Sequence, residues 1–281
     1  MNKIIRKQQL TPETALFEVE APRIAKRWKP GQFIIVRPNA GSERIPLTLV
    51  DGNKERGTIT IVVQRIGKTS AVTVATPADG AFHDVVGPLG EPAHITSVGK
   101  VTLLAGGVGV AEVLPVAKAF KEAGNYTVVL AGARTDSLRI LREELLAVAD
   151  EVIWATDDGS FGFAGNVVQL LQDVVKASGE KPDLSHVIGP IPMMRAAAKA
   201  TKDLGIKTYA SVNPVMIDGT GMCGGCRVTV RGKVRFACVE GPEFDAHEVD
   251  FEELTRRTKA YKKQEVQAYE AHKCALGLQA H

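Results

Sequence analysis

The sequence is poor in aromatic residues, which make up 5% of its 281 residues. Aromatic platforms on which nucleobases stack are therefore not favoured. The chain also lacks a strong charge of one sign, because 35 basic residues face 32 acidic ones and leave a formal net charge of +3. A nucleic-acid-binding protein would usually carry a dominant basic stripe, so we expect no nucleic-acid partner.

Long apolar runs are also missing. The longest uncharged apolar run, residues 101–111, spans 11 residues and contains three glycines, whereas a membrane-spanning helix needs about 20 apolar residues. The first twenty residues contain no apolar stretch of the length typical of a signal peptide. We therefore expect a cytoplasmic protein that does not bind a membrane.

The hydrophobic content of 44% and the charged content of 24% are ordinary for a globular protein, and the length suggests two domains with a small third. Four short segments alternate or run apolar as strands do, with little helical periodicity between them: 16–20, 32–38, 45–50 and 57–66. This pattern predicts an antiparallel β-barrel domain over residues 1–97.

The pattern changes at Lys100, where apolar strands begin to alternate with helices, including a helix predicted over residues 137–149. Such alternation predicts a doubly wound α/β domain with a parallel sheet over residues 98–208. A glycine-rich turn, with Gly106, Gly107, Val108 and Gly109, follows the first strand and opens a helix. Amide groups at such a turn bind the phosphates of a dinucleotide, although a glycine turn packed on the sheet is the plainer alternative.

A second turn, with Gly189, Pro190 and Met193, follows a later strand at the same sheet edge. We predict that it belongs to the same nucleotide site. The alternative for Met193 is packing in the core at the start of a helix.

Cysteine is also scarce, with four residues in the chain, and three of them fall within 16 residues. Asp218, Cys223, Cys226 and Cys238 match the plant-type ferredoxin spacing with aspartate in the first place. This spacing predicts a 2Fe–2S cluster in a module over residues 209–281. Zinc and reduced structural cysteines are the alternatives, and Asp218 could instead cap a turn. The distant Cys274 and the six histidines show no ligand spacing, so we expect the histidines to be surface or structural residues.

Together these motifs resemble the ferredoxin–NADP reductase superfamily, in the branch that ends in a 2Fe–2S module. The segment 211–227 resembles the small subunits of NADH-dependent reduced ferredoxin:NADP oxidoreductases of the sulfide dehydrogenase type, in which an aspartate replaces the first cluster cysteine. The resemblance implies FAD, NAD(H) and a 2Fe–2S cluster as cofactors. It also implies a larger iron–sulfur flavoprotein partner that reacts with NADP and ferredoxin and carries out electron bifurcation.

The resemblance further implies flavin contacts from three segments: Arg44, Pro46, Leu47 and Thr48; Val63, Gln64 and Arg65; and Gly67, Lys68, Thr69 and Ser70. It implies nicotinamide nucleotide contacts from the two glycine turns, Arg134 and Asp157. Three positions depart from the family pattern. Arg44 lies four residues before the hydroxyl residue instead of three, Glu112 stands where proline is usual, and Ile188 replaces a cysteine.

The expected chemistry is a relay. Nicotinamide gives two electrons as hydride, a 2Fe–2S cluster takes one at a time, and a flavin can do both. No catalytic side chain is required for this relay. Arg134 could meet the 2′-phosphate of NADP, whereas Asp136 argues against it. The resemblance favours NAD over NADP.

Two other functions stay open. One is the electron-transfer subunit of dihydroorotate dehydrogenase, which would ordinarily have four cysteine ligands; the other, of a different class, is a zinc-binding interaction module.

The tail from Asp250 predicts a charged helix with too few apolar residues for a broad core-facing stripe. It either lies solvated on its own domain or docks on the larger subunit.

Overall fold

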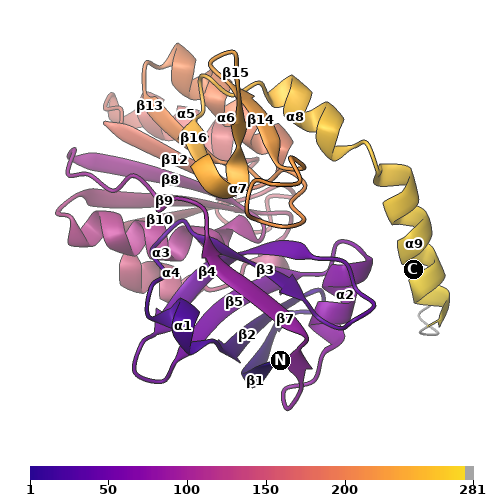
Figure 1. The fold of residues 1–281 in the computed structure, drawn as a ribbon. Coiled ribbons are helices and arrows are strands. Elements are labelled where there is room, and N and C mark those ends of the chain that lie inside the picture. The colour runs from indigo at the N-terminus through magenta and orange to yellow at the C-terminus, as the bar shows by residue number, and fades with distance from the viewer. Residues whose placement is uncertain (276–281) are drawn as a thin grey trace.

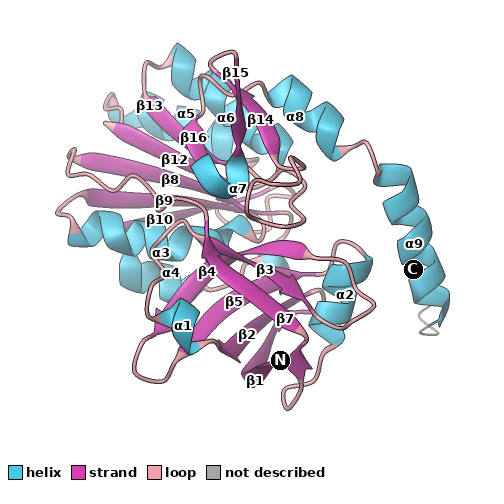
Figure 2. Ribbon diagram, viewed as in Figure 1, coloured by secondary structure: helices cyan, strands magenta, loops and turns pink. Residues whose placement is uncertain are grey.

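The computed structural model describes residues 1–275, with side chains to residue 273, and consists of two seven-stranded sheets followed by a small module (Figures 1 and 2). The first sheet has the strand order β6-β1-β2-β5-β4-β3-β7, and its paired strands are antiparallel. Its elements are β1 (Asn2–Thr11), β2 (Thr14–Glu20), α1 (Pro22–Ala25), β3 (Phe33–Arg37), β4 (Ile45–Asn53), β5 (Thr58–Gln64), α2 (Lys68–Ala75), β6 (Ala81–Phe82) and β7 (Asp84–Leu89). The predicted antiparallel barrel is confirmed as a nearly closed sheet.

All four segments predicted as strands of this domain are strands, β2, β3, β4 and β5. The sequence patterns did not reveal β1, because its polar and charged side chains outnumber its buried ones. It is held by backbone pairing with β2 and β6 and by two buried anchors, Ile4 and Thr11. Pairing with neighbouring strands thus decides the conformation of a segment that has weak apolar alternation of its own.

The second sheet has the order β11-β10-β9-β8-β12-β13-β16, in which every pair is parallel except β13 with β16. Its elements are β8 (Lys100–Gly106), α3 (Gly109–Glu122), β9 (Tyr126–Ala133), the 3₁₀ turn η1 (Asp136–Leu138), α4 (Arg142–Val148), β10 (Glu151–Thr156), β11 (Phe163–Ala164), α5 (Val167–Ser178), β12 (Leu184–Ile188), α6 (Ile191–Asp203) and β13 (Lys207–Ser211). Strand order reverses between β8 and β12, and ligands bind open α/β sheets at the carboxyl ends of such neighbouring strands.

The helix predicted over residues 137–149 begins later than expected. Residues 136–138 form η1 instead, and Leu141 has a left-handed φ of 53° immediately before α4. Leu141 is buried in the core between the domains. Burial of this side chain offsets the strain of the left-handed backbone at Leu141. That conformation interrupts the helix that the apolar periodicity alone predicts.

The α3 helix connects the two domains. Its buried residues Val110, Val113 and Leu114 pack in one core cluster with Val50 of β4 and Val62 of β5. The barrel therefore rests against the helix that begins at the first glycine turn. This packing fixes the position of the flavin-domain strands relative to the nucleotide turn.

The remaining residues form β14 (Arg227–Val230), β15 (Lys233–Phe236), α7 (Ala237–Glu240), β16 (Glu243–Asp245), α8 (Phe251–Thr258) and α9 (Lys262–Ala275). The tail forms a helix from Asp250, as predicted, and the Asp250 side chain caps it by accepting hydrogen bonds from two backbone amides. Within the tail, Phe251 and Leu254 of α8 are buried in the core. Figure 1 shows α9 extending from α8 down the side of the barrel toward α2.

In the part of the chain that the structure describes, none of the helices has the length and apolar character needed to cross a membrane.

Candidate functional site

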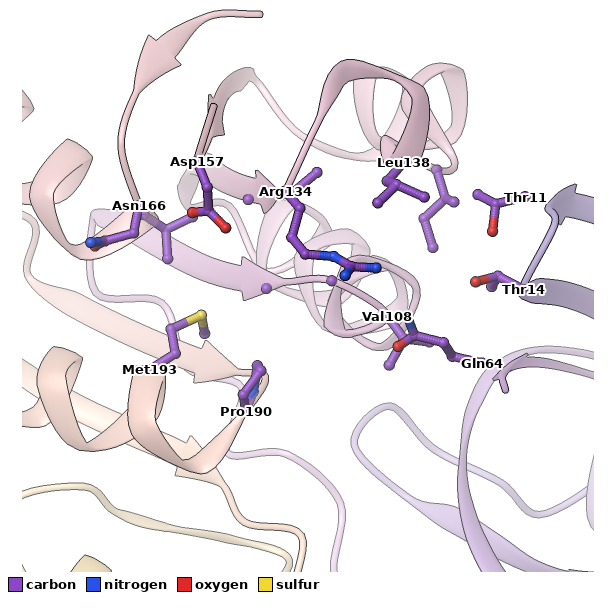
Figure 3. A pocket seen from close by; sticks show the side chains of 16 residues that line it. Thr11, Thr14, Gln64, Val108, Arg134, Leu138, Asp157, Asn166, Pro190 and Met193 are labelled. Atoms are coloured by element: carbon purple, nitrogen blue, oxygen red, sulfur yellow. The ribbon is translucent and has the colours of Figure 1, made fainter. Parts of the chain in front are cut away.

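The largest group of predicted nucleotide residues surrounds a cavity of about 340 Å³ between the two domains (Figure 3). Eight predicted residues line it: Gln64, Gly106, Gly107, Val108, Arg134, Asp157, Pro190 and Met193. Arg134 extends across its middle, Asp157 and Asn166 stand at one end, and Thr11 and Thr14 stand at the other. The carboxyl ends of β8, β9 and β10 therefore converge with the rim of the barrel.

Close packing explains the glycines of the first turn. A Cβ at Gly109 would lie 2.5 Å from the carbonyl oxygen of Ile188, and one at Gly106 would lie 2.4 Å from the sulfur of Met193. The two predicted turns thus touch, and Met193 packs between them. The packing alternative raised for these residues therefore holds, and the nucleotide site at these turns stays a prediction.

Eight of the residues that line the cavity were not predicted from the sequence, and three of these have polar side chains: Thr11, Thr14 and Asn166. Thr11 and Thr14 flank the turn between β1 and β2, a strand pair whose polar pattern gave no indication of a site. Asn166 caps α5 by accepting hydrogen bonds from the amides of Val168 and Gln169. An Asn followed three residues later by Gln is typical of a helix start, and a helix that starts after a strand of the parallel sheet is the signal that could have identified Asn166 as a site residue.

Asp136 does not lie where it could oppose a 2′-phosphate bound beside Arg134. The Asp136 carboxylate pairs with Arg139, whose guanidinium lies over the rings of Phe161 and Trp154. Asp136 is not among the residues that line the cavity, whereas Arg134 is. The preference for NAD over NADP remains a prediction.

The predicted flavin residues lie along the open side of the barrel. Residues 45–48 of β4 and all of β7 are half-buried, although both strands lie within or at the edge of the sheet. Arg44 and Arg65 each contain a buried Nε with no hydrogen-bond partner, while their outer nitrogens reach only as far as Asp84 at 3.7 Å and Glu13 at 3.8 Å. Two guanidinium groups with unused donors beside a half-buried apolar strand fit a flavin with its pyrophosphate.

The third predicted flavin segment begins a helix. The Ser70 hydroxyl accepts hydrogen bonds from the amides of Ile66 and Gly67 and donates to the Gly67 carbonyl oxygen. Ser70 therefore shapes the start of α2, and the amides of the first helical turn remain as anion donors.

The four predicted metal ligands form two pairs. The sulfurs of Cys226 and Cys238 are both buried and 3.1 Å apart. Asp218 accepts hydrogen bonds from the amides of Thr220 and Cys223, at 3.0 and 2.8 Å. These two bonds match the turn-capping alternative, which does not compete with a ligand role because each carboxylate oxygen has a further lone pair.

Through residue 273, no three His, Cys, Asp or Glu side chains converge as a single-metal site requires. A two-by-two arrangement of donors fits a binuclear cluster, in which each iron takes two protein ligands, better than it fits tetrahedral zinc. The hydrogen bond from the Thr220 amide lowers the pKa of Asp218 and keeps it anionic. Burial raises the pKa of Cys238 to about 12, so this thiol needs a metal to lose its proton at neutral pH.

The histidines of the described region include structural ones, as predicted. His186 is buried in β12 and pairs with Glu243 of β16, whose other oxygen accepts hydrogen bonds from the backbone amide and the ring of His94, each at 3.0 Å. His247 contacts the Thr201 hydroxyl at 3.0 Å. Glu243 thus connects the sheet, the linker between the domains and the strand that follows the cysteines.

Comparisons with known proteins agree with this arrangement. A family described as the iron–sulfur cluster binding domain of dihydroorotate dehydrogenase B matches residues 213–250. A Thermotoga maritima protein described as a dihydroorotate dehydrogenase B (NAD(+)) electron transfer subunit homolog is 41% identical, over 96% of this chain and 95% of its own. The dihydroorotate dehydrogenase B (NAD(+)) electron transfer subunit of Bacillus caldolyticus is 34% identical, over 79% of this chain and 86% of its own length.

Among solved structures, a chain of the NADH-dependent reduced ferredoxin–NADP oxidoreductase, described in connection with flavin-based electron bifurcation, superposes with a TM-score of 0.90. It is 40% identical and covers 96% of this chain and 97% of its own. Phthalate dioxygenase reductase, at 17% identity and a TM-score of 0.60, shares the fold.

The barrel, the parallel sheet and the cysteine module define an electron-transfer oxidoreductase of the ferredoxin–NADP reductase type. The chain belongs to the family of dihydroorotate dehydrogenase B electron-transfer subunits and their homologues. The predicted fold class and family are confirmed, and the predicted cofactors, FAD, NAD(H) and an iron–sulfur cluster, agree with this family and fold.

Replacing Asp218 with cysteine should retain a 2Fe–2S cluster but change its reduction potential and its electron paramagnetic resonance spectrum. Carboxylate donates less electron density to iron than thiolate does, so the exchange alters the electronics of the iron that it binds. Asp218→Asn is the matched variant that retains size and removes the anionic donor. If the reduction potential and the spectrum of Asp218→Cys are identical to those of the wild type, Asp218 is not a ligand and only caps a turn.

Proposed function

We propose that this chain is the FAD- and 2Fe–2S-containing subunit of a NADH-dependent reduced ferredoxin:NADP oxidoreductase. It exchanges hydride with NAD(H) and passes electrons to a larger iron–sulfur flavoprotein subunit. Asp218 in the first ligand place carries this proposal, together with a full-length structural similarity at 40% identity to a chain of such an oxidoreductase.

The chain's own residues have distinct parts in this proposal. Gly106, Gly107 and Arg134 would hold the nucleotide phosphates in the cavity, and Met193 would line the part of the cavity that binds the nicotinamide ring. Arg44 and Arg65 would bind the flavin pyrophosphate. Bound FAD supplies the conversion between two-electron and one-electron transfer.

The second candidate function is electron transfer for dihydroorotate oxidation, which the descriptions of the sequence relatives favour. An affinity-tagged chain expressed in its natural host separates the two. Copurification of a larger flavoprotein that reduces NADP with NADH and reduced ferredoxin supports the first proposal. Copurification of a subunit that oxidises dihydroorotate supports the second. A colourless protein containing zinc would contradict both.

The tail helix offers a separate test of the partner. Tyr261, immediately before α9, and Val266 of α9 are 61% and 46% exposed, whereas Tyr269, His272 and Lys273 near the end of α9 are half-buried. We propose that the exposed side of α9 docks on the larger subunit. Truncation after Ala260 should retain the flavin and iron content and weaken copurification of the partner.

The cut must fall after α8, because β16 and α8 belong to the sheet and the core. Tyr261→Ala with Val266→Ala in the full-length chain is the matched variant, since it removes the apolar contacts without removing the helix. Copurification of both proteins at the wild-type ratio would show that α9 does not dock.

A further inference from the structure

The loop that carries the first predicted cluster ligands packs directly on the barrel. Gly219, immediately after Asp218, is buried and has a left-handed φ of 79°. A Cβ at Gly219 would lie 2.6 Å from Cδ1 of Leu89 in β7 and 2.8 Å from Cδ1 of Ile35 in β3. Carbon atoms pack best about 3.5–4.0 Å apart, so a side chain at residue 219 would have to displace the loop or the strands by about 1 Å.

The other end of the ligand segment holds the same strand. Gly241 lies three residues after Cys238, and its carbonyl oxygen accepts a hydrogen bond from the amide of Glu91 at 2.6 Å. A Cβ at Gly90 would lie 2.7 Å from that oxygen. The end of β7 is therefore held between the loop after Asp218 and the turn after Cys238, the first and the last of the predicted ligands.

The barrel side of this contact has little room to move. Ile35 is 1% exposed and belongs to the same core cluster as Cys226 and Cys238, and Leu89 packs against that cluster. Added volume in a well-packed core forces its neighbours to shift. The loop that follows Gly219 reaches the surface, so a larger residue there would lift the loop rather than move β3.

The face of the sheet that meets the loop also carries two predicted flavin residues. Pro46 of β4 is paired with Ile35 of β3, and Thr48 is paired with Phe33. Both β3 residues pack in the core cluster that contains the buried cysteines. Side chains directly opposite each other in paired strands share one face of the sheet, so their β4 partners lie on that face as well, one strand away at about 4.8 Å. Leu47, between these partners, faces the barrel core instead.

We propose that Gly219 is a positioning residue for electron transfer, which allows the cluster loop to rest on β3 and β7 and so sets the distance between the cluster and the flavin. This inference deepens the proposed function and rests on it. In the step concerned, NADH loses a hydride and becomes NAD⁺, and the flavin gains the two electrons. These electrons pass singly to the cluster, where each converts one ferric ion to ferrous before the larger subunit accepts it, and the proton of the hydride passes to solvent.

The test compares Gly219→Ala with Gly221→Ala in the holoprotein. Gly221 has a similar φ of 82° in the same loop, but a Cβ there would meet Val239 of the module itself, at 3.1 Å, whose exposed side chain can turn away. Both variants strain the loop backbone, because alanine is unfavourable in the left-handed region, and only Gly219→Ala collides with the barrel.

Stopped-flow absorbance separates the two steps of the relay. NADH should reduce the flavin of both variants at the wild-type rate. Transfer from the flavin to the cluster should slow only in Gly219→Ala, by about 10–100-fold, because a misplacement of about 1 Å can cost the larger factor. Combining Gly219→Ala with Leu89→Ala removes the nearest colliding atom and should recover part of the lost rate.

A second variant tests the same contact with every glycine intact. Leu89→Phe presses on the loop from the barrel side and should slow the same step, including where Gly219→Ala fails to assemble a cluster. Pulsed electron paramagnetic resonance of the half-reduced holoprotein measures the distance between the cluster and the flavin without turnover. That distance should increase in Gly219→Ala and Leu89→Phe and remain at the wild-type value in Gly221→Ala.

The possible failures point to different conclusions. A wild-type rate and distance in Leu89→Phe, or equal values in Gly219→Ala and Gly221→Ala, would overturn the inference and leave the proposed function intact. A wild-type holoprotein whose flavin NADH does not reduce counts against the proposed function, whatever distance the resonance experiment gives.

Discussion

Replacing Cys238 with alanine is expected to remove the iron–sulfur cluster and stop electron transfer beyond the flavin. The Cys238 sulfur is buried beside that of Cys226, at 3.1 Å, and in the described chain no third donor converges there to replace it. Changes in groups that only support ligands weaken metal binding by about 10–100-fold, so loss of a ligand should cost at least as much. Iron and sulfide content and the visible spectrum measure the loss.

The predicted flavin residues belong to the barrel and not to the segment that carries the cysteines, so the variant should retain FAD and its reduction by NADH. Cys274→Ser is the matched control. Its side chain lies outside the described residues, and the prediction for it rests on its distance from the motif in sequence. Loss of iron in Cys274→Ser, or a full cluster in Cys238→Ala, would refute the predicted set of ligands.

Replacing Glu243 with alanine is expected to produce the largest loss of stability. The Glu243 side chain is 5% exposed and pairs with His186, which is 2% exposed. Removal of one partner leaves the other buried without its counter-charge, which costs about 3–5 kcal/mol. Glu248→Ala is the control, since its contact with Arg231 spans 3.6 Å at the surface and is worth about 0–1 kcal/mol. Denaturant unfolding measures both free energies.

This loss should depend on pH in a defined direction. Burial alone would raise the pKa of Glu243, but the charge of His186 and the hydrogen bonds from His186 and His94 outweigh it and lower the pKa to about 2, from an ordinary value of 4.5. A lowered pKa gives stability that is present above 4.5 and is lost as the pH falls toward 2. The difference between wild type and Glu243→Ala should therefore shrink over that range, and a constant difference would show that Glu243 does not act through its charge.

The sequence by itself determined the features that depend on local patterns. Apolar alternation and strand–helix succession predicted the barrel and the parallel sheet, because each element must bury one face. The glycines at 106 and 109 predicted a close approach of backbone, and the structure shows what they approach, Met193 and Ile188. The spacing of Asp218 and the three cysteines predicted a cluster loop, because all four donors lie in one short segment.

Only the tertiary structure decided features that join distant segments. The strand β16 lies next to β13 and gives His186 its partner across 57 residues. Phe251 and Leu254 join the core because α6 and β14 leave an apolar surface that α8 covers, which the sparse apolar pattern of the tail does not reveal. Thr11 and Thr14 face the cavity because the barrel rim meets the parallel sheet there. Each of these contacts depends on how two domains pack together, and periodicity within one segment contains no information about that packing.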